Sequence, residues 1–376
     1  MKVVIAIDSF KGSLSSLQAG NAVKEAILRL KNDAEIVVKP LADGGEGTVD
    51  ALAESAASQI VELKVKGPLL QPVTAKYCIL QDTQTAVMEM AAASGITLIS
   101  GEERNPLETT TFGVGEMILD AINRGCRRFI VGIGGSATND GGTGMLTALG
   151  YEFLDQKGNP IPLGAKGLAD LYCIKTENVI PELEECQFQI ACDVVNPLCG
   201  TNGCSAVYGP QKGATPEMVN HMDRWLQNYG ALSQTVSPKA DPDYPGAGAA
   251  GGLGFAFLAF TDSVLRSGIQ IVLDELRLEA EIKTADIVVT GEGRLDSQTV
   301  MGKAPIGVAS LAKKYGKKVI AFSGCVTPDA EVCNLHGIDA YFPVLRSVTT
   351  LEEALDPQNA YQNVAATAYQ VFRLLI

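Results

Sequence analysis

The sequence predicts an α/β protein with mostly parallel sheets and two domains. Short, β-branched, continuously apolar runs recur along the chain, as in parallel strands that are covered on both faces. Amphipathic helical patterns lie between several of these runs, which is typical of the crossover connections of parallel sheets. The 376 residues are too many for one ordinary core, so we expect two domains.

The predicted strands are spread over the whole chain, at residues 3–7, 36–41, 129–133, 188–192, 287–290, 319–322 and 341–345. Helices are predicted at 17–30 and 114–122, where apolar residues share one helical face, and at 361–375. Gly125 follows the second of these helices and is expected to cap it.

Two stretches, 67–110 and 155–185, contain more prolines, turn signals and polar breaks than the rest of the chain. We therefore expect a Rossmann/flavodoxin-like parallel-sheet domain formed by both chain ends, residues 1–66 plus 265–376. Residues 67–264 are expected to form a second α/β domain, inserted between those two segments.

Charge and composition exclude several classes of protein. The net charge of −13 disfavours binding of nucleic acid, which usually needs a basic face. The longest apolar stretch, 246–260, is shorter than the roughly 20 residues that span a bilayer. The first apolar run is interrupted at Asp8, too early for a signal peptide, so we expect a cytoplasmic protein without a membrane partner. A homodimer is one of the oligomeric states that the sequence leaves open.

Acidic residues and glycines follow most of the predicted strands at their C-terminal ends. The segments concerned are Asp8–Gly12, Asp43–Gly47, Gly134–Gly142, Asp193 and Gly291–Asp296. In open α/β sheets, ligands bind beyond the carboxyl ends of the strands. Any one of these segments could simply cap a strand or begin a helix, but five together favour a ligand site.

The chemistry of these segments suits phosphoryl transfer. Glycine-rich backbone amides cradle phosphate oxygens, carboxylates hold Mg²⁺, and lysine or arginine offsets the charge of the transferred group. The residues alone therefore predict phosphoryl transfer that involves a small anionic partner.

Two other classes of function remain open at this stage. Gly132-x-Gly134-x-x-Ala137 follows a strand and resembles a dinucleotide fingerprint, which would indicate an NAD-dependent dehydrogenase of a small hydroxy acid. However, two further glycines, Gly141 and Gly142, interrupt the expected start of the helix. A non-enzymatic module that binds a small acid is the other alternative, and the excess of acidic residues counts against it. P-loop and protein-kinase motifs are absent from the sequence.

Eight long motifs occur in the order in which they occur in one enzyme family. They are DSFKGSLS from Asp8, LADGGEGT from Leu41, TFGVGEMI from Thr111, GIGGSATNDGGTGML from Gly132, CDVVNPLCG from Cys192, YGPQKGAT from Tyr208, PGAGAAGGLGF from Pro245 and VVTGEGRLDSQTVMGKAP from Val288. Over almost its whole length the chain resembles the bacterial glycerate kinases, which are unrelated to the P-loop and ribokinase-like kinases.

This resemblance implies a kinase that uses ATP and Mg²⁺ to phosphorylate D-glycerate. The implied product is 2-phosphoglycerate, with 3-phosphoglycerate as the other assignment. The resemblance also implies two α/β domains with the active site in the cleft between them.

The candidate catalytic residues lie at the strand ends. Asp193 is expected to be the base that accepts the proton of the attacking hydroxyl. Lys11, beside Asp8, is assigned to a phosphate or to the carboxylate of glycerate. Arg294 is expected to clamp that carboxylate, since a guanidinium binds a carboxylate in a bidentate manner.

The remaining candidates are expected to bind phosphate, substrate or metal. The phosphate and substrate group is Ser9, Gly134, Gly135, Ser136, Thr138, Asn139, Gly291, Gly293 and Lys303, with Lys212 as a weaker candidate. The expected metal ligands are Asp43, Glu46, Asp140, Glu292 and Asp296.

Overall fold

The computed structural model describes residues 1–45, 47–55 and 57–376. The chain divides into two compact units: unit 1 comprises Met1–Asp43, Asp50–Ala56 and Ile269–Ile376, and unit 2 comprises Gly44–Val49 and Ala57–Gly268. The prediction placed residues up to 66 in the domain of the chain ends. The strand Ser58–Lys66 instead falls in unit 2, because it pairs with the strand that follows it there.

Unit 1 is built on a five-stranded parallel sheet with the order β13-β12-β11-β1-β2. Its strands are β1 (Lys2–Ile5), β2 (Glu35–Val38), β11 (Ile287–Leu295), β12 (Lys318–Val326) and β13 (Ala340–Pro343). The central strands β1 and β11 are almost continuously buried, which is the pattern that predicted a parallel sheet covered on both faces.

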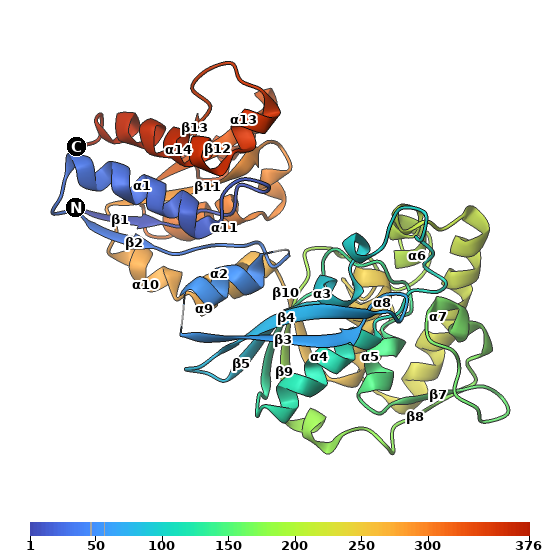
Figure 1. Ribbon diagram of the computed structural model, residues 1–376. Coiled ribbons are helices and arrows are strands. Elements are labelled where there is room, and N and C mark those ends of the chain that lie inside the picture. Colours follow the sequence, from blue (N-terminus) through green and yellow to red (C-terminus); the bar gives the residue numbers. More distant parts are fainter. Residues whose placement is uncertain (46, 56) are drawn as a thin grey trace. The chain divides into compact units, whose positions relative to one another are not determined.

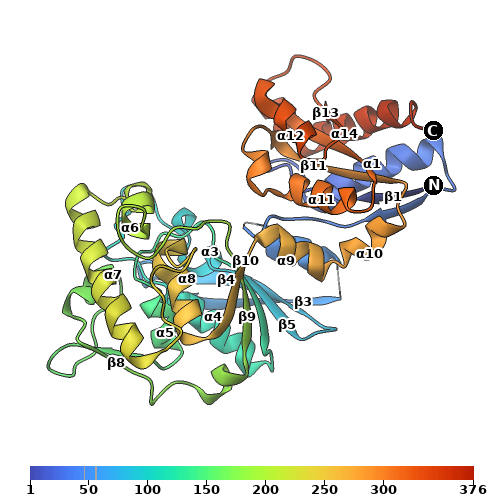
Figure 2. The ribbon, with the colours of Figure 1, turned by 180° about the vertical axis from the view of Figure 1, so that it is seen from behind.

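Helices cover both faces of this sheet (Figures 1 and 2). They are α1 (Ser16–Leu30), α9 (Gly268–Glu275), α10 (Leu278–Lys283), α11 (Ala304–Lys313), α12 (Val332–Leu335), α13 (Leu351–Leu355) and α14 (Pro357–Phe372). α1 and α14 pack side by side and share one apolar core with β1, β11 and β12, while α11 packs on β11 outside that core. α1 begins with a capping box in which Ser15 accepts from the amide of Gln18 and Gln18 accepts from the amide of Ser15.

Unit 2 is built on a six-stranded mixed sheet with the order β10-β9-β6-β5-β4-β3. The strands β5, β6, β9 and β10 are parallel, whereas β3 and β4 form an antiparallel hairpin at one edge. The bounds are β3 (Ser58–Lys66), β4 (Pro72–Leu80), β5 (Thr85–Glu89), β6 (Arg128–Gly132), β9 (Gln187–Ala191) and β10 (Asp262–Arg266), and a separate pair is formed by β7 (Glu152–Leu154) and β8 (Cys173–Lys175).

The helices of unit 2 enclose one large apolar core. They are α3 (Ala91–Ser94), α4 (Phe112–Asn123), α5 (Thr143–Ala148), α6 (Cys204–Tyr208), α7 (Pro216–Val236) and α8 (Ala249–Phe260), and α2 (Thr48–Ser55) begins in unit 2 and continues in unit 1. Gly125, just after α4, has a φ of 90°, so its predicted capping conformation is confirmed.

The expected α/β class with parallel sheets is confirmed, and a solved structure with the same fold is described below. The prediction missed the β3–β4 hairpin, because prolines and polar residues near 67–72 mark its turn and were interpreted as irregular structure. The sequence-based prediction also ended the strand β11 at Thr290, whereas the strand continues to Leu295 beside β12.

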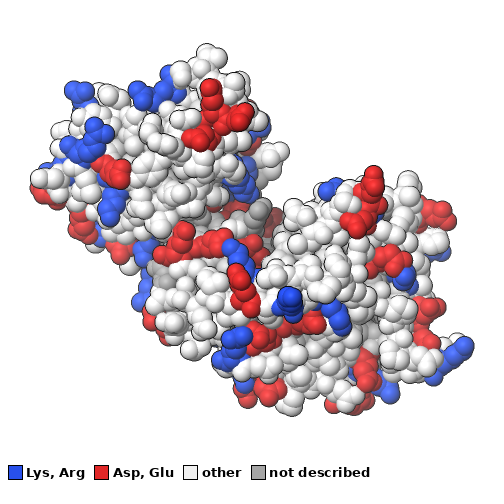
Figure 3. Space-filling model, viewed as in Figure 1, with Lys and Arg blue, Asp and Glu red and all other residues white. Residues whose placement is uncertain are grey.

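In the part of the chain that the structure describes, no helix is both long and apolar enough to cross a membrane. On the face shown in Figure 3, basic and acidic side chains are interspersed over the surface of both units.

Candidate active site

In unit 1, two buried acids are Asp8, which follows β1, and Glu292, which lies within β11. The amide of Asp8 donates 2.9 Å to the carbonyl of Gly291, which fixes Asp8 beside β11. The Asp8 side chain is buried, and burial together with the charges of Asp43 and Glu292 raises its pKa to about 7. A hydrogen bond from the amide of Ser9 (2.6 Å) and the charge of Lys11 oppose this rise.

Glu292 is the centre of a second group of charges in unit 1. Its Oε1 accepts a 2.6 Å hydrogen bond from Thr299, and its Oε2 lies 3.9 Å from Nζ of Lys303. The same Nζ lies 3.7 Å from Asp296, whose other oxygen is 3.2 Å from Nε of Arg294. Burial raises the pKa of Glu292, and the Thr299 bond and the Lys303 charge oppose the rise. The predicted set Glu292, Arg294 and Asp296 is thus brought together with Lys303.

Gly291 and Gly293 were expected to bind substrate or phosphate, and both lie within β11. Gly291 pairs with Phe322 of β12, and a Cβ at Gly291 would lie 2.0 Å from the Phe322 carbonyl oxygen. The need for glycine at 291 is therefore explained by the close packing of two strands. Gly293 is next to the backbone of Phe10 and Lys11, again within unit 1.

In unit 2, β6 leads into a long glycine-rich loop before α5 begins at Thr143. The carbonyl of Gly135 accepts from the amide of Ile96, and the amide of Ala137 donates to Ser94, so the first half of the loop is fixed against the residues after α3. Gly134 and Gly135 are exposed, and within the described residues no hydrogen-bond acceptor faces the amides of 134, 135 or 136. These amides form the part of the loop that can bind an anion.

The second half of the loop is interior, which corrects three predicted roles. Thr138, Asn139 and Asp140 have no exposed surface, so a direct contact of these side chains with phosphate or metal is not supported. The Asp140 carboxylate accepts five hydrogen bonds from the protein, donated by the amides of Thr111, Gly142 and Gly144 and the hydroxyls of Thr110 and Thr111. Its lone pairs are used in holding the loop on α4, and this excludes it from the metal set.

Two further features lie at the same edge of the unit 2 sheet. The segment after Asp43 passes close to β6, since a Cβ at Gly132 would lie 2.5 Å from the Gly44 carbonyl oxygen. Glu89, at the end of β5, accepts from the amides of Gly47 (3.1 Å) and Val49 (3.0 Å). The sequence analysis missed Glu89, although an acid at a strand end was the signal that it used elsewhere. Glu46, a predicted metal ligand, lies outside the described residues.

Asp193, the predicted base, follows β9 and is exposed, with Oδ1 accepting 3.3 Å from the amide of Gly268. Lys212, the weaker phosphate candidate, is buried and donates to Ser136 and to the carbonyl of Thr138. Among the described residues, no group of three or more His, Cys, Asp or Glu is arranged to hold a metal ion. The four described members of the predicted metal set, Asp43, Asp140, Glu292 and Asp296, therefore do not form such a group.

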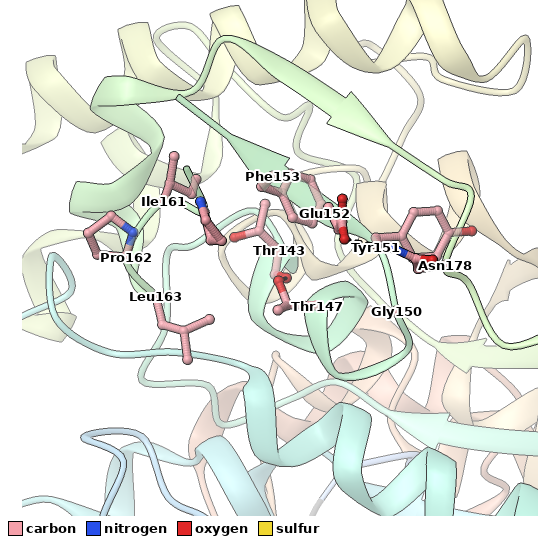
Figure 4. A pocket seen from close by; sticks show the side chains of 11 residues that line it. Thr143, Thr147, Gly150, Tyr151, Glu152, Phe153, Ile161, Pro162, Leu163 and Asn178 are labelled. Carbon is pink, nitrogen blue, oxygen red and sulfur yellow. Dashed lines mark hydrogen bonds between the residues drawn. The ribbon is translucent and has the colours of Figure 1, made fainter. Parts of the chain in front are cut away.

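A separate pocket of about 270 Å³ lies in unit 2 beside α5 and β7 (Figure 4). Its described lining includes Thr143, Thr147, Glu152 and Asn178, and no predicted site residue is among those that line it. It does not coincide with the anion-binding part of the loop.

The chain was compared with known families and proteins. A model of the glycerate kinase family matches residues 3–376. A glycerate kinase of Haemophilus influenzae is 47% identical over 375 residues, which cover 100% of this chain and 99% of the relative. A glycerate 2-kinase of Escherichia coli is 46% identical over 371 residues, which cover 99% of this chain and 97% of the relative.

A solved structure has the same fold as this chain. The crystal structure of a protein described as a glycerate kinase 2 from Salmonella typhimurium LT2 superimposes with a TM-score of 0.93 at 48% sequence identity. The match covers 100% of this chain and 98% of that chain.

Proposed function

Because the chain belongs to the glycerate kinase family, we propose that it transfers the terminal phosphoryl group of ATP to the 2-hydroxyl of D-glycerate, with Mg²⁺ assisting. The resemblance found in the sequence is confirmed, and with it the class of enzyme, a phosphotransferase that uses ATP and acts on an alcohol group. The dehydrogenase and the non-enzymatic binding module are thereby set aside. The 2-hydroxyl is favoured over the 3-hydroxyl because a relative of 46% identity is a glycerate 2-kinase.

The observation that carries the proposal is that the amides of the exposed Gly134 and Gly135 and of the neighbouring, buried Ser136 donate no hydrogen bond within the described residues. Successive loop amides without an internal acceptor can donate to the oxygens of a phosphate group. In unit 1, Lys303 and Lys11 supply positive charge next to buried acids, as phosphoryl transfer requires. We assign the nucleotide phosphates to the loop amides of unit 2.

The acidic group of unit 1 fits Mg²⁺ in chemistry. This ion usually keeps several waters and is bound by one or two carboxylates together with substrate phosphates, so a protein-made cage of three acids is not required. Burial is the main cause that raises the pKa of Asp8, and the charges of Asp43 and Glu292 add to it; a bound cation would offset that negative charge. Asp43 and Glu292 are the residues we assign to hold the ion, which when bound neutralises charge on the phosphates.

The remaining roles concern the acceptor. The exposed Arg294 is oriented by Asp296 and is assigned to the carboxylate of glycerate. Asp193, exposed at the end of β9, is assigned to accept the proton of the attacking hydroxyl.

The test is a coupled ADP-release assay with Mg-ATP and D-glycerate, followed by phosphorus NMR of the product. We expect ADP release that depends on glycerate and a phosphorus signal split by the single proton on C2. A signal split by the two protons on C3 would move the product to 3-phosphoglycerate. No release with glycerate would overturn the proposal.

A further inference from the structure

Lys212 is a lysine in the interior of unit 2, buried against the glycine-rich loop that follows β6. It ends the short 3₁₀ turn Pro210–Lys212, and only 2% of its surface is exposed. Its Nζ donates 2.8 Å to Oγ of Ser136 and 2.6 Å to the carbonyl oxygen of Thr138. The lysine thus joins two loop residues from a segment more than 70 residues away in sequence.

Burying an ammonium group costs free energy, because the charged group loses its contacts with water. Burial lowers the pKa of Lys212 to about 8, against the opposing influence of Cys204 and Asp140. An apolar side chain of similar volume would fill this space without that penalty. The retained charge therefore has to be explained by what it does to Ser136 and Thr138.

The effect on Ser136 follows from the number of protons on a hydroxyl. A serine hydroxyl has one proton to donate and two lone pairs to accept with. Because Lys212 donates to Oγ, the hydroxyl proton of Ser136 points away from Nζ. Ser136 is also fixed through its neighbours, since Gly135 and Ala137 hydrogen-bond to the residues after α3. Its hydroxyl is then a preset donor at the end of the amide row of residues 134–136.

The geometry points to Lys212 as a positioning residue that fixes the Ser136 hydroxyl as a hydrogen-bond donor to a phosphate oxygen of the nucleotide. Lys212 itself does not touch the substrate; it acts through Ser136 and through the carbonyl of Thr138, which it holds in the interior. This inference rests on the proposed function, in which the loop binds phosphate.

The test is a double-mutant cycle with Lys212→Met, Ser136→Ala and the double variant, each measured for kcat, KM for ATP and thermal stability. A lost hydrogen bond to a charged ligand group lowers kcat/KM for ATP by about 10-fold to 100-fold. We expect each single variant to show such a loss and the double variant to be no worse than Lys212→Met. Losses that multiply in the double variant would overturn the inference, because Lys212 would then act independently of Ser136.

Two further variants show whether a loss of activity comes only from a loss of folding. Lys212→Gln keeps N–H donors within reach of Ser136 and is expected to recover part of the activity lost in Lys212→Met. Lys239→Met removes an exposed lysine that donates 3.3 Å to the carbonyl of Thr261, and is expected to change nothing. Ser136→Ala removes only the hydroxyl group. Unchanged kinetic constants in that variant would refute the inference, whether or not the lysine variants fold.

The proposed function and this inference fail in different ways. A wild-type protein without glycerate-dependent ADP release would refute the proposed function. Calorimetric titration with ATP and Mg²⁺ still tests Lys212 in that case, because the coupling between Lys212 and Ser136 in the ATP dissociation constant does not depend on the acceptor. Additive effects in that titration would overturn the inference alone.

Discussion

Thr299 donates a 2.6 Å hydrogen bond to Oε1 of Glu292, and both side chains are buried in unit 1. Thr299 also accepts 3.2 Å from the amide of Asp296, so one hydroxyl sets the position of two of the acids of the candidate site. The sequence showed no reason to select this residue, because a single threonine three positions after an aspartate is common at turns.

Thr299→Val keeps the shape of the side chain and removes the hydrogen bond to Glu292. We expect a loss of stability of about 1–3 kcal/mol, because a buried carboxylate loses a donor, together with a higher requirement for Mg²⁺ in the assay. Thr299→Ser keeps the hydroxyl and is the matched control. An unchanged Mg²⁺ dependence in a folded Thr299→Val protein would contradict the assignment of Glu292 to the metal.

Arg294→Ala is expected to raise KM for glycerate by about 10-fold to 100-fold and to leave KM for ATP near its original value. Arg294→Lys keeps the charge but loses the planar pair of donors, so it is expected to rescue little. Arg346→Ala, at another exposed arginine of unit 1, is the control. If the KM values for both ATP and glycerate stay normal in Arg294→Ala, Arg294 has no role in binding glycerate and only forms its ion pair with Asp296.

Asp193→Asn tests the assigned base without moving the backbone, since an asparagine can still accept from the amide of Gly268. We expect kcat to fall by about 100-fold or more while both KM values change little. Asp223 makes the same kind of bond, accepting 2.8 Å from the amide of Gly200 in the same unit, so Asp223→Asn is a close control. Near-normal turnover in Asp193→Asn would remove Asp193 from the catalytic residues.

Parts of this site were predictable from the sequence and parts were not, for definite physical reasons. Asp8 and Asp193 were found because an acid soon after a buried strand is visible in the linear order of residues, and Glu292 was found because the predicted strand ended at Thr290, although Glu292 lies within β11. The roles of Asp140 and Gly291 were not, because they depend on contacts with Thr111 and Phe322 that are distant in sequence. Lys212 was undervalued for the same reason, since only the fold shows that it is buried against Ser136.

Parts of the fold were likewise predictable from the sequence, and other parts were not. Most of the parallel strands were predicted from their apolar runs, but the parallel strands β5 and β10 were missed. β3 was missed because it is an edge strand with alternating exposure, and the polar residues of its outer face conceal it.

Asp8 is expected to destabilise the ligand-free protein at neutral pH. Its pKa is about 7 in the folded chain and 3.8 in an unfolded one, so its folded pKa is raised. The stability present below pH 3.8 is therefore lost as the pH rises towards 7, because the unfolded chain ionises first. Asp8→Asn removes this loss and is expected to be more stable than wild type above pH 7, by on the order of 2–4 kcal/mol, although it loses activity.

The measurement is denaturant unfolding of wild type and Asp8→Asn from pH 4 to pH 8, with EDTA present so that no bound cation masks the effect. The difference in the free energy of unfolding between the two proteins should be small at pH 4, grow as the pH rises and level off above about 7. A gap that is constant with pH would show that the carboxyl of Asp8 is not perturbed.

Asp140→Asn separates a structural role from a metal-binding role at the glycine-rich loop. The carboxylate accepts from five donors, and an asparagine turns one of its oxygens into an N–H₂ group that faces N–H or O–H donors. We expect a stability loss of at least about 2 kcal/mol, since buried donors are left without acceptors, and an unchanged Mg²⁺ dependence of the activity that remains. Asp155→Asn is the control, because Asp155 accepts from the amides of Lys157 and Asn159 in an exposed turn where water can replace it. A stable Asp140→Asn protein with a raised Mg²⁺ requirement would restore Asp140 to the metal ligands, because only a role in holding the ion would then explain its burial beneath the loop.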